Sequence, residues 1–98
     1  MKVEFTLLAE RQLENLYNYI ADHSSEQIAE RYITRIVIFC EKLAEFPNRG
    51  TRHDDILSGL RTVGFERRVT IAFLVSPDTV LIEGIFYGGQ DFAARFRS

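Results

Sequence analysis

The sequence predicts an α+β fold in two layers, with the element order β-α-α-β-β-β. In the first half of the chain, apolar residues recur at the spacing of amphipathic helices. After Pro47 the pattern changes to runs of β-branched and aromatic residues, separated by turn-forming Pro, Gly, Asp and Ser. Two helices followed by consecutive strands indicate a helical hairpin that packs on an antiparallel sheet. We therefore expect residues 1–98 to form a single domain.

The first half begins with a short strand, "VEFT" at 3–6, and Thr6 is then expected to cap the first helix. Ser24 and Gln27 have the spacing of a capping box, which predicts the start of the second helix. "FPNRG" at 46–50 ends that helix, because Pro disrupts helical geometry and Gly suits a turn. The apolar stripes are Ala9, Leu13, Leu16, Tyr17 and Ile20 in the first helix and Ile28, Tyr32, Ile33, Ile36, Phe39, Cys40 and Leu43 in the second.

Three strands are predicted in the second half of the chain. They are "GLRTVG" at 59–64, "FERRVTIAFLV" at 65–75 and "VLIEGIFY" at 80–87. "SPDT" at 76–79 is a turn between the last two, with Pro at its second position. The last strand is almost entirely apolar, as expected of a central strand or of one buried on both faces.

Composition excludes several classes of protein. The chain has 12 Lys and Arg against 14 Asp and Glu, and a net charge of −2 argues against a broad grip on a nucleic-acid backbone. Residues 1–46 carry a charge of −3, whereas residues 47–98 carry +1, and all the basic residues there are arginine. The sequence shows neither a secretory signal nor a transmembrane run, so we expect a cytoplasmic protein without membrane contact.

No metal site is predicted. Cys40, the single cysteine, lies on the apolar stripe of the second helix and is interpreted as a small buried hydrophobe. One cysteine cannot form an intramolecular disulfide, which is typical of a reducing compartment. His53, Asp54 and Asp55 are adjacent instead of spaced to converge on a metal ion, and His23 lies in the predicted turn between the helices.

No cofactor is predicted either. Gly84, Gly88 and Gly89 do not have the spacing of nucleotide-binding motifs, and they follow the last strand instead of opening a βα unit. The glycine pair at 88 and 89 is expected to let the chain turn tightly as that strand ends. Asp91 is then placed to cap one final helical turn.

The arginines of the sheet are the main candidates for function. Arg61 lies in the predicted second strand, and Arg67 and Arg68 near the start of the third. Adjacent strand residues face opposite ways, so one of this pair is expected on the open side of the sheet and the other on its covered side. Bridges to Glu66 or Glu83 are one interpretation. The other is a cationic surface beside Tyr87 that binds a partner's carboxylates or phosphates.

A series of short motifs runs along nearly the whole chain: Ala9, Leu13, Leu16, Tyr19 and Ile20, then Leu43, Phe46, Pro47 and Gly50, then Leu60 and Arg61, the strand 70–75 and the segment 86–91. In this order the motifs resemble the ParE/RelE family of toxins from bacterial toxin–antitoxin systems. Each motif alone is weak, but the complete ordered series is fairly specific. The family's fold is the helical hairpin on an antiparallel sheet that the periodicity already indicates.

The resemblance implies one of two activities. RelE-like members cut messenger RNA at the ribosome without a metal, whereas ParE-like members poison DNA gyrase. In both branches a cognate antitoxin neutralises the toxin, and operator DNA is contacted only through that antitoxin. A third possibility is a non-toxic relic of the fold that still binds its antitoxin.

The ParE-like branch is favoured, and with it a toxin that is not an enzyme. A metal-free endoribonuclease needs a general base and several cations at the scissile phosphate. Arg61, Arg68 and Tyr87 could form a minimal set of this kind, which keeps the nuclease as an alternative, but only two lysines, Lys2 and Lys42, are present. Tyrosine, with an ordinary pKa near 10, is also a poorer base at neutral pH than the histidine that many family members have there.

The expected binding surface for the antitoxin is an apolar groove between the hairpin and the edge of the sheet, together with the arginines. The short tail after the last strand is predicted to join the surface that binds target or antitoxin. The predicted contact residues are Arg61, Arg67, Arg68, Tyr87, Asp91, Phe92, Arg95 and Phe96.

Overall fold

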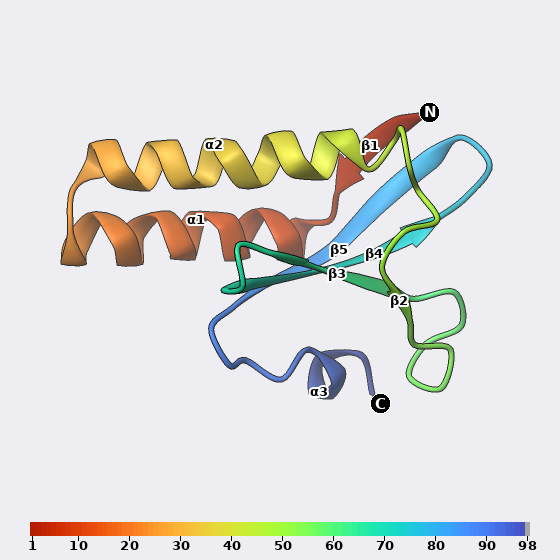
Figure 1. The fold of residues 1–98 in the computed structure, drawn as a ribbon. Helices are drawn as coiled ribbons and strands as arrows, with labels where there is room; N and C mark the ends of the chain where they lie inside the picture. Colours follow the sequence, from red (N-terminus) through yellow and green to blue (C-terminus); the bar gives the residue numbers. More distant parts are fainter. Residues whose placement is uncertain (98) are drawn as a thin grey trace.

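The computed structural model describes residues 1–97, and within them a helical hairpin packs on a five-stranded sheet (Figure 1). The strand order is β1-β5-β4-β3-β2, with β1 parallel to β5 and all other neighbours antiparallel. The predicted α+β fold is confirmed, and β5 is an inner strand as expected. The elements are β1 (Lys2–Phe5), α1 (Leu7–His23), α2 (Glu26–Lys42), β2 (Thr51–Arg52), β3 (Arg61–Phe65), β4 (Val69–Val75), β5 (Thr79–Tyr87) and α3 (Phe92–Phe96).

The caps of the two long helices agree only in part with the sequence. The Thr6 hydroxyl accepts a hydrogen bond from the Ala9 N–H at 3.1 Å, so the predicted cap of α1 is confirmed. The predicted capping box at Ser24 is wrong. Ser24 ends α1, while the next residue, Ser25, has an extended backbone and caps α2 through the Ile28 N–H at 3.1 Å. Because Ser24 and Ser25 are adjacent, the spacing of a capping box does not identify which of them caps α2.

The prediction of one strand over 65–75 is also wrong, because the chain reverses between β3 and β4. The Arg68 N–H donates to the Phe65 carbonyl at 3.2 Å, which closes a two-residue turn. Glu66 and Arg67 have φ angles of 49° and 62°, the region used by the tight turns of β-hairpins. Such turns usually contain Asn and Gly, so "ER" carried no turn signal. Arg67 and Arg68 therefore do not alternate across a strand as expected.

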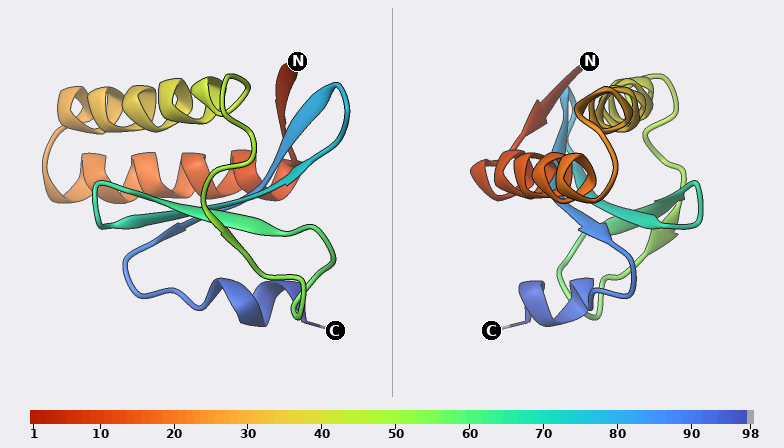
Figure 2. Two further views of the ribbon diagram at one scale, coloured as in Figure 1. Left: turned by 45° about the vertical axis from the view of Figure 1, so that its right-hand side comes forward. Right: turned by 90° about the vertical axis from the view of Figure 1, so that its left-hand side faces the viewer.

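The sheet has a hydrophobic core on each face. The hairpin covers one face and α3 lies against the other (Figure 2). In β4, Ile71 and Phe73 pack under the hairpin, whereas Ala72 and Leu74 belong to the α3 side, as the two-residue period of a strand requires. The α3-side core is made of Leu60, Ala72 and Phe86, with Ile56, Leu74, Phe92 and Phe96 packed around them.

Two further predictions concern the core and the chain's relation to membranes. Cys40 is fully buried, as predicted, and burial together with the neighbouring Glu41 raises its pKa to about 12. Its thiol is therefore protonated at neutral pH and packs as an apolar group. None of the helices within residues 1–97 has both the length and the apolar character needed to span a bilayer.

Candidate functional site

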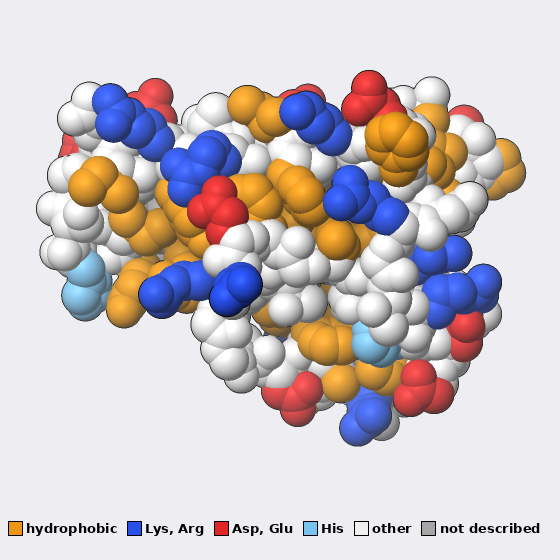
Figure 3. Space-filling view, viewed as in Figure 1, with side chains coloured by type: hydrophobic (Ala, Val, Ile, Leu, Met, Phe, Trp, Pro, Cys, Tyr) orange, Lys and Arg blue, Asp and Glu red, His pale blue; other side chains and the backbone are white. Residues whose placement is uncertain are grey.

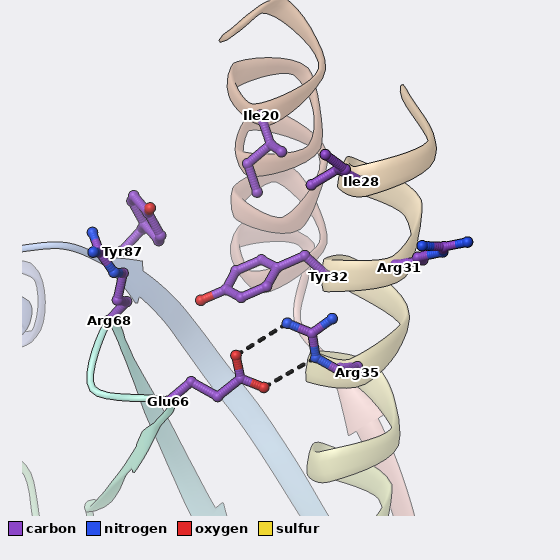
Figure 4. Close-up of a pocket in the computed structure, with 8 residues that line it drawn as sticks. All are labelled: Ile20, Ile28, Arg31, Tyr32, Arg35, Glu66, Arg68 and Tyr87. Carbon is purple, nitrogen blue, oxygen red and sulfur yellow. Dashed lines mark hydrogen bonds and ion pairs between the residues drawn. The ribbon is translucent and has the colours of Figure 1, made fainter. Parts of the chain in front are cut away.

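A groove of about 450 Å³ lies at the loop end of the helical hairpin, between the two helices, the β3–β4 turn and the end of β5. Figure 3 shows a hydrophobic band along the junction of hairpin and sheet, with basic and acidic side chains beside it. Figure 4 shows the lining side chains coming from these separate elements, with Tyr32 and Arg35 directed across the groove and Arg31 directed away from it. They are Ile20, Ile28, Arg31, Tyr32, Arg35, Glu66, Arg68 and Tyr87.

A β-bulge in β5 brings Tyr87 into this groove. Ala72 of β4 pairs with Gly84 and Phe73 pairs with Ile82, so Glu83 is the extra residue. Before the bulge Val80 and Ile82 face the hairpin, and strict alternation would continue with Gly84 and Phe86 on that side. The extra residue changes the parity, so that Ile85 and Tyr87 face the hairpin and Phe86 faces α3.

Side chains of the hairpin hold the bulged backbone. The Gln12 side-chain oxygen accepts a hydrogen bond from the Ile85 N–H at 2.6 Å, and the Thr6 hydroxyl donates to the Glu83 carbonyl at 3.3 Å. A bulge removes ladder hydrogen bonds, and these contacts replace them. At the end of the strand, Gln90 accepts from the Tyr87 N–H at 2.9 Å, and Gly88 has a φ of 66°, which fits its predicted role in the turn.

A two-pronged ion pair ties the β3–β4 turn to α2. Arg35 Nε and Nη2 donate to the two carboxylate oxygens of Glu66, each at 3.0 Å. The hydrogen bond raises the pKa of Arg35 and lowers the pKa of Glu66. Glu66 is one of the two acids predicted to bridge, but its partner comes from α2 instead of from the strand arginines. The guanidinium of Arg35 also lies 5.1 Å from the Tyr32 ring centroid, a cation–π contact.

Tyr32 carries a buried hydroxyl that has no hydrogen-bond partner within residues 1–97. Its oxygen points toward Tyr87 and Arg68 across the groove (Figure 4). Burial, followed by the charges of Tyr87 and Glu66, raises the pKa of Tyr32. The group is therefore a neutral donor at physiological pH, in a place where an unpaired polar group is costly.

Tyr87 stands in the middle of a row of aromatic rings. Its centroid lies 6.4 Å from that of Tyr32 and 6.2 Å from that of Tyr19, and Tyr19 in turn is 4.2 Å from His23. On its far side Tyr87 lines a second, smaller groove of about 340 Å³ with Gln12, Asn15, Leu16, Tyr19, Ile85 and Gln90. Tyrosine and arginine side chains together are typical of the energetic centres of protein–protein interfaces.

The structure brings only some of the predicted arginines to this site. Arg68 lines the groove with Tyr87, whereas Arg67 is exposed at the tip of the turn and is not among the lining residues. Arg61 lies at the opposite end of β3, and its guanidinium donates to the carbonyls of Asn48 and Arg49 at 3.0 and 3.4 Å. The set Arg61, Arg68 and Tyr87 is therefore not assembled at one place.

The tail is part of the second core. The Asp91 carboxylate accepts from the N–H groups of Ala93 and Ala94, so the predicted cap of a final helical turn is confirmed. Phe92 and Phe96 place their rings 6.3 and 6.0 Å from Phe86. Arg95 is exposed beside them. The role of the tail in binding target or antitoxin stays a prediction, but its two aromatic residues already contact the sheet.

The polar residues near α3 do not form a metal-binding cluster. Asp54 accepts two hydrogen bonds from Arg52, at 3.0 and 2.9 Å, and one from the Gly59 N–H at 2.8 Å. His53 shares a 2.7 Å hydrogen bond with the Thr62 hydroxyl, and its ring meets that of Phe92 edge-on. Within residues 1–97, no three His, Cys, Asp or Glu side chains converge as metal ligands.

The family model described as "ParE toxin of type II toxin-antitoxin system, parDE" matches residues 3–92. The chain belongs to the ParE toxin family. The predicted resemblance to the ParE branch is thus confirmed, and the protein is the toxin component of a type II toxin–antitoxin system.

The toxin also shares its fold with a chain of known structure, described as "Chromosomal ParDE TA system from P. aeruginosa". The two chains superpose with a TM-score of 0.78 at 22% sequence identity, over 90% of this chain and 96% of the other. At this identity the likeness concerns the fold. No curated protein sequence matched the chain.

Sequence reasoning missed several residues of the groove. Arg35 is not among the residues predicted for the site, Tyr32 is predicted only as a core residue of the second helix, and Glu66 is predicted within a strand. A local signal did exist, because Tyr32 and Arg35 are three residues apart on a helix and therefore lie on the same face. The pairing of Arg35 with Glu66 had no local signal, since it depends on how the hairpin crosses the sheet.

Proposed function

We propose that this toxin arrests bacterial growth by poisoning DNA gyrase, and that a cognate antitoxin neutralises it. The observation that carries the proposal is the match of the ParE family model to residues 3–92, nearly the whole chain. Composition agrees with a target that is a protein surface, because the chain has a net charge of −2 and its arginines are dispersed.

Messenger RNA cleavage, the alternative, receives less support from the site. A metal-free nuclease needs a base and several cations around one phosphate. Arg61 is held by backbone carbonyls at the far end of β3, and Arg35 is neutralised by Glu66. Arg68 is then the only sequence-predicted arginine beside Tyr87 in the groove. The proposed toxin therefore acts by binding and carries out no catalytic step.

For the antitoxin we propose the groove at the loop end of the hairpin as a docking site. Ile28 and Tyr19 are each about half exposed, at 51% and 52%, and lie at the borders of the two neighbouring grooves. Together with Ile20 and Tyr87 they border a surface with the aromatic and arginine content of a binding centre. Contact with operator DNA is assigned to the antitoxin.

Two assays on the purified toxin test the target. In a supercoiling assay, the toxin is expected to inhibit gyrase and to leave cleaved DNA trapped on the enzyme. In a translation assay programmed with a defined transcript, the transcript is expected to remain intact. Cleavage of the transcript at the ribosome, with gyrase unaffected, would replace this proposal with the nuclease.

A growth assay separates an active toxin from a relic of the fold. Induced expression of the chain alone is expected to stop growth and to cause filamentation, because blocked gyrase halts chromosome segregation. Co-expression of the antitoxin is expected to restore division. Normal growth in cells that contain the folded protein would show that the toxic activity has been lost.

A further inference from the structure

The unpaired hydroxyl of Tyr32 is the feature of the groove that its internal contacts leave unexplained. Buried polar atoms in folded proteins almost always have a hydrogen-bond partner. This oxygen is shielded by the surrounding side chains and has none within residues 1–97. It points across the groove toward Tyr87 and Arg68 (Figure 4), so a shift of the exposed Arg68 side chain would open it to a ligand. A ligand atom that accepts a hydrogen bond at this point would satisfy it.

Arg68 supplies a cation on the opposite wall. It takes part in none of the ion pairs within residues 1–97, whereas Arg35 is paired with Glu66. The backbone around Arg68 is fixed at both ends of the residue. Its N–H donates to Phe65, and its carbonyl accepts from Gly88 at 2.7 Å. The guanidinium thus extends from a rigid base toward the groove.

We propose that the groove binds one carboxylate of an acidic protein segment, held between the guanidinium of Arg68 and the hydroxyl of Tyr32. The apolar side chains of Ile20 and Ile28 and the ring of Tyr87 contact the apolar residues that flank this acid. The segment belongs to the antitoxin, so the inference rests on the proposed function in that one respect.

Two observations favour a carboxylate over a phosphate. Arg35 and Glu66, which both line the groove, are paired with each other, so within residues 1–97 the groove lacks the array of free cations that a nucleic-acid backbone, negative at every step, requires. Glu66 also shows that the groove accepts a carboxylate with good geometry, since it pairs with Arg35 through two bonds of 3.0 Å. With Arg35 paired in this way and Arg31 pointing away from Tyr32 (Figure 4), the guanidinium of Arg68 and the hydroxyl of Tyr32 match a single carboxylate.

The test is a titration of the full-length toxin with two blocked pentapeptides, Ala-Leu-Glu-Leu-Ala and its counterpart with Gln in the centre. Binding is followed by NMR through the Arg68 Nε–H and the Tyr32 ring. The acidic peptide is expected to bind at least about tenfold more tightly, because hydrogen bonds to charged groups are the stronger ones. Equal affinities, or no shifts up to about 10 mM peptide, would overturn the assignment.

Matched variants locate the site. Arg68→Gln and Arg67→Gln remove the same charge from adjacent exposed positions, but only Arg68 lines the groove. Arg68→Gln and Tyr32→Phe are each expected to abolish most of the preference for the acidic peptide, whereas Arg67→Gln retains it. If Arg67→Gln loses as much as Arg68→Gln, long-range charge accounts for the binding and the subsite is rejected.

Two further experiments have separate purposes. One asks whether the ligand is a protein carboxylate or a nucleic-acid phosphate, and the other tests the proposed gyrase target independently of this site. Inorganic phosphate and a uridine hexanucleotide are expected to shift the same signals less than the acidic peptide does; tighter binding of either would assign the groove to nucleic acid. The gyrase assay is independent, because the titration contains no target. If the toxin has no effect on gyrase but still selects the acidic peptide, gyrase is rejected as the target and the carboxylate-binding site is retained.

Discussion

Tyr32 of α2 meets Tyr87 of β5 edge to face, with ring centroids 6.4 Å apart and an interplanar angle of 89°. The contact exists because the bulge at Glu83 turns Tyr87 toward the hairpin. Gln12 and Thr6 satisfy the bulged backbone from the side of α1. The shape of the groove therefore depends on hydrogen bonds that lie outside it.

Replacing Gln12 by Ala is expected to destabilise the toxin by about 1–2 kcal/mol, because the Ile85 N–H loses its acceptor. Gln12→Glu is the matched variant: a carboxylate also accepts from an N–H, so it should retain most of the lost stability. Urea unfolding measures both. A similar loss in the two variants would mean that the amide acts through packing instead of as an acceptor.

Gly84→Ala is expected to cost about 1–3 kcal/mol through overpacking. A Cβ at this position would lie 2.5 Å from Cε2 of Phe86, the ring on which α3 packs. Gly89→Ala is the control, since nothing lies within 4 Å of its Cβ. Thermal unfolding gives the stabilities, and faster hydrogen exchange at Ala93 and Ala94 in the Gly84 variant would report the loosening of α3. Equal effects at the two glycines would contradict the close contact.

The ion pair of Glu66 with Arg35 predicts a pH dependence of stability. The hydrogen bonds from Arg35 lower the pKa of Glu66 in the folded state below the value near 4.3 of an unfolded chain. The contribution is therefore present above that unfolded value and is lost as the pH falls through the lowered folded pKa.

Melting temperatures recorded between about pH 2 and pH 7 check this dependence. In Glu66→Gln the acid-induced decrease should become smaller but should not vanish. Asp54 also has a lowered pKa, caused by hydrogen bonds from Arg52 and from the Gly59 N–H. If the decrease of the melting temperature at low pH is the same in Glu66→Gln as in the unchanged protein, solvent already screens the exposed pair completely.

Tyr32→Phe is expected to stabilise the free toxin by up to about 1 kcal/mol, because it removes a buried hydroxyl that has no partner. Tyr19→Phe is the comparison, since Tyr19 is 52% exposed and its hydroxyl can bond to water. Chemical denaturation distinguishes the two. Marked destabilisation by Tyr32→Phe would mean that an ordered water satisfies the hydroxyl. The same substitution should weaken acidic-peptide binding, which is the usual opposition of stability and function.

Arg67→Gly is expected to stabilise the β3–β4 turn by about 0.5 kcal/mol. The φ of 62° is unfavourable for a residue with a Cβ. Gly removes this conformational strain from the folded state, and we expect that gain to be slightly larger than the cost of the extra backbone entropy that Gly gives the unfolded chain. Arg67→Val removes the same charge but places a β-branched residue in the left-handed region, so it should destabilise. If both variants unfold at the same urea concentration, the turn adapts to its residue and stores no strain.

Much of the fold could be read from local patterns. The stripes of α1 and α2, the Pro at 47, the turn at 76–79 and the cap at Asp91 each act within a few residues, and periodicity or turn chemistry reports them directly. The errors have other causes. The Ser25 cap is local, but two adjacent serines make it ambiguous. The turn at 66–67 and the two-residue β2 carry weak local signals and occur together with contacts to distant segments, namely the pair of Glu66 with Arg35 and the pairing of β2 with β3.

The sequence by itself determined the α+β class, the burial of Cys40, the capping of α3 and the ParE family, because each follows from short-range pattern or from residue order. Only the tertiary structure decided which side chains share the groove. The parity of β5 changes at Glu83 through a bulge held by α1, and this change selects Tyr87 over Phe86 for the hairpin side. Arg35 meets Glu66, and Arg61 is kept apart, because packing fixes distances between segments that the sequence leaves unrelated.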